Sequence, residues 1–324
     1  MRYFVGAYAA SPCGAEWNAT AEAAYFDGLK RIPTLRGLET PFTGALHRFD
    51  EAWFMDHVDP TWDFVVTCIP GTMGALQSNP QFGLASDSEP GRRAALAFAG
   101  EAREAVARLN RRLGRAAVVA VELHSAPSPA IDGVSASAAA FSGSLAEIAG
   151  WDWQGARLAV EHCDAFQPGQ PCIKGFLGLA AEIEAVLEAN ARSTGRIGIA
   201  VNWGRSVLET RNPATAVDHI RQLRSAGLLS GLMFSGCGGL ASPYGVWQDT
   251  HMPHAPAPGI EHAAEGSALG EEEISRALAA AVPSALTFLG VKLAARPDSA
   301  SIATRVGLSR DLLTLIERHA PAAA

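Results

Sequence analysis

The segment RLAVEHCD, at residues 157–164, carries the pattern that decides the fold. Its apolar run ends in charged side chains, and a helix-like stretch follows it. Near-continuous apolar strands are typical of a parallel sheet that is buried on both faces. Charged groups at the end of such a strand are costly unless they are paired or serve a purpose.

Seven further runs of this kind recur along the chain, and helix-like sequence separates them. They are RYFVGAYA (2–9), GLETP (37–41), DFVVTCIP (63–70), AVVAVELHSA (117–126), IGIAVNWGR (197–205), LSGLMFSGC (229–237) and LTFLGVKLA (286–294). This alternation predicts parallel β/α units. The first run is interpreted as a strand rather than a signal peptide, because its apolar stretch is short and contains two tyrosines.

Eight units in 324 residues predict one domain over residues 1–324, a single (β/α)8 TIM barrel with a long loop after strand 7. That loop runs from Gly238 to about Gly270. An open doubly wound sheet would show G-x-G-x-x-G after its first strand, and ASPCGAEWN (10–18) does not. Helix signals agree with the barrel: Asn212 before Pro213 indicates a helix start, and Gly114 indicates a helix end.

Composition narrows the classes of partner. The chain has 33 acidic against 26 basic residues, a net charge of −7, which disfavours nucleic acid and membrane surfaces. Its five cysteines form no C-x-x-C pair, so reduced thiols and a cytoplasmic location are expected. The sequence contains no run of 18 or more apolar residues, so it predicts no membrane span. A homo-oligomer is left open.

Polar side chains gather at the predicted strand ends, which converge on one mouth of a barrel. They are Glu39, Glu122, His124, Glu161, His162, Asp164, Asn202, Trp203, Arg205 and Lys292. Strand alternation places Glu122 and His124 on the same side, and it places His162 behind the strand, opposite to Glu161. Trp203 is either core or a platform that stacks on sugar, and the sequence leaves both open.

The long loop adds a second group of polar residues. WQDTHMPHAP (247–256) supplies Asp249, His251 and His254. Carboxylate and imidazole suit zinc or manganese, but the spacing matches no closed motif. If a divalent metal binds, we expect Glu161, His251 and His254 to hold it. The loop's length, prolines and glycines predict a lid over the site.

At these residues the chain resembles the xylose isomerase-like barrel superfamily of sugar isomerases, epimerases and endonuclease-type enzymes. It looks closest to an uncharacterised bacterial branch known as a domain of unknown function. The resemblance implies a divalent metal held by Glu, Asp, His and Glu on strands five to eight, with the two glutamates moving a proton between sugar carbons. Glu161 matches the first of these ligands. Asn202, Ser235 and Lys292 stand near the other three and differ from them.

The sequence therefore predicts an isomerase or epimerase that acts on a small carbohydrate by carboxylate acid–base chemistry. Glycosidic bond cleavage by Glu122 and Glu161, as a hydrolase or lyase, is the second hypothesis. A non-catalytic sugar-binding barrel is the third. We predict Glu161, Glu122 and Lys292 as catalytic. Lys292 either takes the place of the metal or forms an ion pair with Glu161 or Glu122 that only neutralises the pocket, and the sequence leaves both open. The predicted substrate-binding residues are Glu39, His124, Asn202, Trp203, Arg205, Asp249 and His251.

Overall fold

A computed structural model describes residues 2–193 and 195–320. Within these residues eight parallel strands close into a barrel in sequence order, so the predicted barrel is confirmed. The strands are β1 (Tyr3–Val5), β2 (Leu35–Pro41), β3 (Asp63–Thr67), β4 (Val118–Leu123), β5 (Arg157–His162), β6 (Ile197–Asn202), β7 (Leu229–Phe234) and β8 (Phe288–Val291). Most are shorter than the predicted runs, because the chain leaves the sheet at the polar strand ends.

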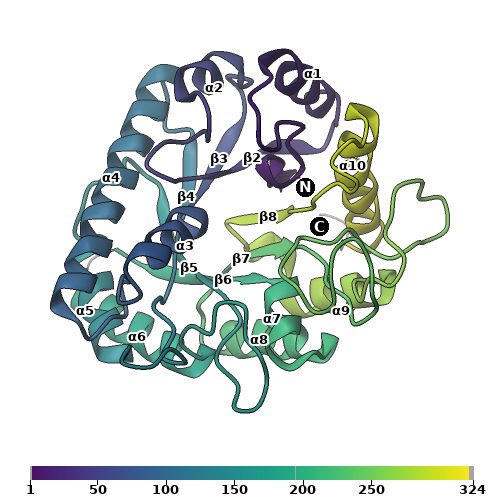
Figure 1. The fold of residues 1–324 in the computed structure, drawn as a ribbon. Helices are drawn as coiled ribbons and strands as arrows, with labels where there is room; N and C mark the ends of the chain where they lie inside the picture. Colours follow the sequence, from purple (N-terminus) through teal and green to yellow (C-terminus); the bar gives the residue numbers. More distant parts are fainter. Residues whose placement is uncertain (1, 194, 321–324) are drawn as a thin grey trace.

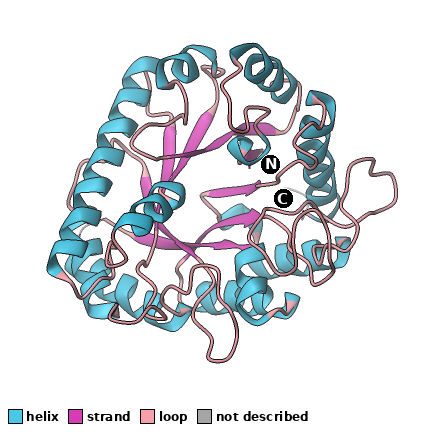
Figure 2. Cartoon of the chain, in the orientation of Figure 1, coloured by secondary structure: helices cyan, strands magenta, loops and turns pink. Residues whose placement is uncertain are grey.

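Helices surround the barrel and cover its outer wall (Figures 1 and 2). They are α1 (Ala19–Leu29), α2 (Glu51–His57), α3 (Ile69–Ser78), α4 (Glu89–Leu113), α5 (Ala138–Ala149), α6 (Leu179–Arg192), α7 (Trp203–Thr210), α8 (Pro213–Ser225), α9 (Glu271–Ala281) and α10 (Ile302–His319), with the short 3-10 turns η1 (Ala7–Ala10) and η2 (Pro283–Ala285). The predicted boundaries are confirmed at Asn212, whose side chain caps α8, and at Gly114, which ends α4 in the left-handed conformation.

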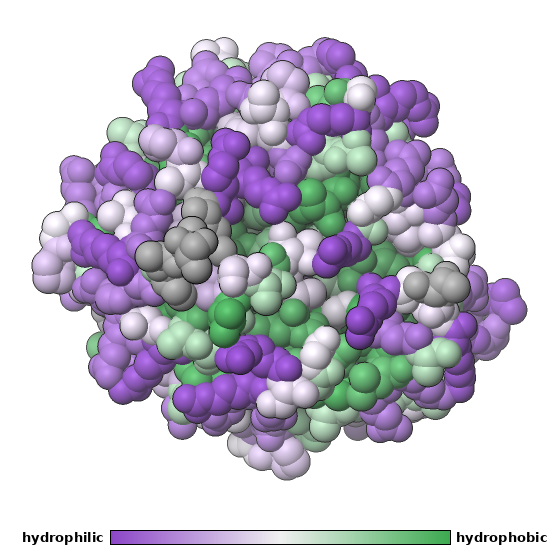
Figure 3. All heavy atoms as spheres, turned by 180° about the vertical axis from the view of Figure 1, so that it is seen from behind, coloured by the Kyte–Doolittle hydropathy of each residue, from purple (hydrophilic) through white to green (hydrophobic). Residues whose placement is uncertain are grey.

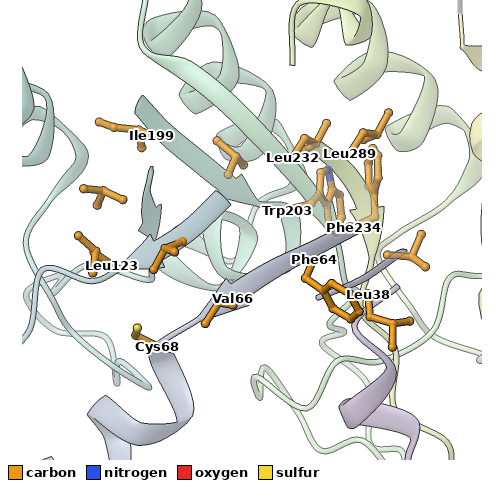
Figure 4. Packing of buried hydrophobic residues seen from close by; sticks show 14 of the residues in the cluster. Leu38, Phe64, Val66, Cys68, Leu123, Ile199, Trp203, Leu232, Phe234 and Leu289 are labelled. Atoms are coloured by element: carbon orange, nitrogen blue, oxygen red, sulfur yellow. The ribbon is translucent and has the colours of Figure 1, made fainter. Parts of the chain in front are cut away.

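Strand alternation divides the core into two parts. Outward residues such as Val160 and Ile199 pack against the helices in one large apolar cluster (Figure 4). Inward residues such as Ala159, Ala200 and Phe288 form a smaller cluster that fills the barrel. The inward side chains at the strand centres are therefore apolar, and polar groups appear only above them, at the carboxyl ends.

The loops that follow the strands lie toward the viewer in Figure 1, and the helix-to-strand turns lie behind. The longest strand-to-helix connection joins β7 to α9 across residues 235–270, without helix or strand of its own apart from one bridge between Gly236 and Met252. On the opposite face, hydrophilic residues dominate the periphery and hydrophobic residues gather toward the middle (Figure 3). None of the helices in the described residues is long and apolar enough to cross a membrane.

Candidate active site

A ring of inward-facing positions lies near the carboxyl end of each strand or one residue beyond it, above the apolar cluster that fills the barrel. Its members are Gly6, Glu39, Thr67, Glu122, Glu161, Asn202, Ser235 and Lys292. Every polar member is buried, with at most 3% of its surface exposed. Because a charge in such surroundings must be paired, the contacts within the ring decide which groups are ionised.

Glu161 is the most heavily partnered member of the ring. Its carboxylate lies 2.6 Å from the Arg205 guanidinium, 2.9 Å from His124 Nε2 and 3.4 Å from Lys292 Nζ. Asn202 Nδ2 donates a further hydrogen bond of 3.2 Å. Burial alone would raise the pKa of Glu161, but Arg205 and Lys292 hold that pKa well below its usual range. Glu161 is therefore an anion that its neighbours hold in place.

Lys292 links Glu161 to a second carboxylate. Its Nζ lies 2.5 Å from Glu39 Oε1, and the Tyr8 ring lies beneath it at 5.7 Å. Burial would lower the pKa of Lys292, but Glu161 and Glu39 raise it well above its usual range. Gly6 makes this pair fit, since a Cβ there would come within 2.6 Å of Glu39 and 2.8 Å of the Lys292 side chain.

Glu122 differs from the other two carboxylates of the ring. Within the described residues, no amide, hydroxyl or basic side chain donates a hydrogen bond to its oxygens, and its side-chain hydrogen-bond neighbour is Glu39. Its carboxylate lies within 4.8 Å of those of Glu39 and Glu161. Burial, and after it the negative charges of Glu161 and Glu39, raise the pKa of Glu122 well above its usual range. Burial also raises the pKa of Glu39, against the lowering effect of Lys292. The ring therefore combines two glutamates with raised pKa values, one glutamate with a lowered pKa and a lysine.

Asp249 fastens the long loop to the ring. It lies 3.0 Å from Arg205 Nε, and its other close partner is the Lys174 ammonium. These two cations hold the pKa of Asp249 well below its usual range in spite of its burial. His251 Nδ1 lies 3.4 Å from the same carboxylate, and burial lowers the pKa of His251 to about 3. Sequence reasoning missed Lys174, since a lysine in a loop gives no signal of burial.

Most of the predicted site residues thus converge, but Trp203 and His254 do not join them. Trp203 is fully buried in the outer apolar cluster, beside Leu232 and Phe234 (Figure 4). The stacking-platform interpretation is wrong, because alternation turns this side chain away from the barrel mouth, toward the helices. The same rule was applied to His162, and its prediction is confirmed: His162 lies behind β5, bonded to Glu182 and Glu209.

The predicted metal set is not brought together. Among the residues that the structure describes, the groups with ligand spacing are Glu39–Glu122–Glu161 and His162–Glu209–His219, and neither contains His251 or His254. His254 is buried within the loop, away from the ring carboxylates.

The ring side chains are also unsuited to bind the divalent ion that the resemblance to xylose isomerase-like barrels implies. Lys292 lies among its three carboxylates, and Arg205 holds Glu161. A cation already in that position repels a second one.

A cavity of about 190 Å³ lies beside the ring, with Glu39 among the residues that line it. Tyr8 of η1, the end of β2 and the loop around His47 and Phe49 line it as well. Its walls are largely apolar.

Comparison with known families agrees with this architecture. Residues 4–308 match the family described as Domain of unknown function (DUF4862). The chain belongs to this family. An uncharacterized protein of Salmonella typhimurium strain LT2 is 34% identical over 317 residues, which cover 98% of this chain and 97% of that protein.

The DUF4862 chain also resembles solved structures. A putative xylose isomerase from Rhodospirillum rubrum matches with a TM-score of 0.60 and 12% identity, over 99% of this chain and all of the other. D-psicose 3-epimerase, in a crystal structure with D-fructose, matches with a TM-score of 0.55 and 13% identity, over 98% and 99% of the two chains. The fold is therefore that of the xylose isomerase-like barrels, and the resemblance expected from the sequence is confirmed.

Proposed function

We propose that this chain moves a proton next to the carbonyl of a small sugar or sugar derivative, as an isomerase or epimerase, without using a metal ion in the ring. One observation carries the proposal: the buried carboxyl group of Glu122, whose pKa its surroundings raise, lies within 4.8 Å of two further glutamate carboxyl groups that both contact a buried lysine. Neighbouring acids whose pKa values are pushed apart are the arrangement that acid–base catalysis requires. The two barrels compared above, named for sugar isomerisation and epimerisation, support the same class.

Glu122 is the proton carrier in this proposal. Once it has released its own proton to solvent, its carboxylate is a stronger base than that of an ordinary glutamate, because its pKa is raised. Glu161, which the sequence predicted as catalytic, is held by two cations that lower its pKa, and it is therefore a weak base. We assign it the task of fixing Arg205 and Lys292.

Lys292 supplies the positive charge. Abstraction of a proton beside a carbonyl leaves an enediolate, whose oxygen needs a preorganised cation or donor. Lys292 Nζ is fully buried and is held by Glu39 and Glu161 on either side, so it needs no rearrangement to offer that charge. Glu39 pairs with this ammonium group and also lines the cavity, so a substrate bound there would lie beside the pair.

Deuterium exchange tests the proposal. A panel of aldoses, ketoses and glycosides is incubated with the protein in D2O containing chelator, and mass spectrometry follows deuterium at the carbon beside the carbonyl. We expect exchange by the chelated protein, and loss of exchange in Glu122→Gln. Exchange that appears only after Zn²⁺ or Mn²⁺ is added back would contradict the metal-free mechanism.

Glycosidic bond cleavage is the second candidate. The separation of the ring carboxylates, at most 4.8 Å between ligand oxygens, is close to the ~5 Å of retaining glycosidases. A protonated Glu122 would act as the acid. The same panel separates the two functions, because cleavage of a glycoside releases a sugar without deuterium entering beside a carbonyl.

A further inference from the structure

A second group of titratable side chains lies outside the ring, behind β5. His162, Glu209 and His219 offer three ligand atoms within 4.8 Å of one another, and all three residues are buried. They come from β5, α7 and α8. The proposed reaction does not use this group, because strand alternation separates His162 from Glu161 and from the barrel interior.

The distances in the group are those of a metal site before an ion enters. His162 Nε2 lies 3.1 Å from Glu209 Oε2, and His219 Nε2 lies 3.9 Å from Glu209 Oε1. Tetrahedral ligands about 2.0–2.1 Å from zinc are themselves about 3.3 Å apart. The His162–Glu209 distance is close to this spacing. His219 Nε2 lies farther from Glu209 and must approach by about 0.6 Å or more before one ion can bind all three residues.

The far nitrogens of both histidines are anchored in the way that metal-binding histidines require. His162 Nδ1 lies 2.7 Å from Glu182 Oε2, and Ser125 Oγ donates to the other oxygen of Glu182 at 2.5 Å. His219 Nδ1 lies 3.0 Å from Ser206 Oγ. A carboxylate or hydroxyl on Nδ1 fixes the tautomer and directs Nε2 toward the ion. Both Nε2 atoms therefore point at the same glutamate.

The group also lies close enough to solvent for an ion to reach it, and its donor atoms are of the kinds that bind zinc. The side chains of Glu209 and His219 are each 8% exposed, so one edge of the group lies near the surface. Two imidazoles and one carboxylate suit zinc among the common divalent ions, with a water completing four ligands.

We propose that His162, Glu209 and His219 form a zinc site at the outer wall of the barrel, with Glu182 and Ser206 orienting the histidines. The ion takes the place of the proton between His162 and Glu209. It ties the end of β5 to α7 and α8. Because α7 also carries Arg205, the bound ion steadies the helix that holds Glu161.

Metal titration tests this site. The full-length protein is stripped with chelator, desalted and titrated with Zn²⁺, and with Co²⁺ to record the visible absorption of a tetrahedral site. We expect one equivalent per chain, tetrahedral Co²⁺ bands and a rise in melting temperature with Zn²⁺. His219→Ala, at the edge of the group, should weaken Zn²⁺ affinity at least tenfold. Even the loss of a residue that only hydrogen-bonds to a metal ligand lowers metal affinity about 10- to 100-fold.

The control is His57→Ala, which removes an exposed histidine of α2. It should bind Zn²⁺ and Co²⁺ as the unchanged protein does. Equal binding by folded His219→Ala, or no stoichiometric binding by the unchanged protein, would show that the group is an ion-pair network and overturn the proposal. Neither result depends on the activity of the ring.

Discussion

At the scale of single residues, Glu122 owes its character to what surrounds it. The residue itself is an ordinary glutamate, but burial and two neighbouring carboxyl groups raise its pKa well above the usual range. We expect Glu122→Gln to lose roughly 10²- to 10⁴-fold in exchange rate, the usual contribution of general acid–base catalysis. The exposed Glu104→Gln on α4 is the matched control and should keep full activity.

The same substitution should stabilise the fold as the pH rises. The folded state keeps a proton that the unfolded chain releases near pH 4.5, so stability is full below that pH and falls as the pH rises through the raised pKa of Glu122. Glutamine stays neutral throughout. Melting temperatures from pH 5 to 9 should therefore favour Glu122→Gln increasingly, and a constant difference would argue against a protonated Glu122.

Substitutions at Lys292 distinguish a catalytic role of this residue from a purely structural ion pair. Lys292→Met leaves Glu39 and Glu161 short of a cation, and breaking such a buried pair costs about 3–5 kcal/mol of unfolding free energy. Adding Glu39→Gln should restore much of that stability, measured by denaturant unfolding, without restoring activity. If the stabilised double variant turns over substrate normally, Lys292 is structural only.

At the scale of elements, the short β1 and the turn after it make room for the ring. Gly6→Ala would place a methyl group 2.6 Å from Glu39 Oε2 and push Lys292 from its position. We expect lower activity and a lower melting temperature. Gly100→Ala on α4, where nothing lies within 4 Å of the added carbon, should instead raise stability by up to about 1 kcal/mol.

The loop across residues 235–270 depends on one carboxylate for its attachment to the ring. Asp249→Asn weakens the contacts of Asp249 with Arg205 and Lys174, because an amide carries no charge. We expect faster proteolytic cleavage within the loop, detected by mass spectrometry of the fragments. The exposed Asp218→Asn on α8 serves as control and should leave the cleavage rate unchanged.

At the scale of the whole molecule, α10 completes the layer of helices around the barrel, and Asp311 attaches α10 to the long loop. Its carboxylate accepts hydrogen bonds from the His262 backbone at 2.8 Å and lies 3.0 Å from His262 Nδ1. Against the effect of burial, these bonds and Arg310 lower the pKa of Asp311.

The stability that Asp311 contributes is present above its unfolded pKa of about 3.8 and is lost as the pH falls through the lower folded value. Melting temperature should drop between pH 5 and 3. Asp311→Asn should be less stable at pH 7 and should lose less on acidification. Parallel curves for the two proteins would contradict this assignment.

The barrel was predictable because its signals are local. Apolar runs of strand length, helices between them and caps such as Asn212 and Gly114 appear in the sequence as short patterns. Period-two alternation also assigned His162 to the outer wall correctly, since that rule needs only the position along one strand. The same rule places Trp203 on the side of the helices. The sequence of one strand alone, however, does not say which of its faces packs against the helices and which faces the barrel interior.

Sequence order alone predicts where the strands end. It therefore also predicts the convergence of the residues at those ends, which are Glu39, Glu122, Glu161 and Lys292. It does not predict their charges. Whether a glutamate is an acid, a base or an anchor depends on distances between residues more than a hundred positions apart, as between Glu161 and Lys292. Closure of the barrel sets those distances, and the free energy of a buried charge depends on them more strongly than on the identity of the residue.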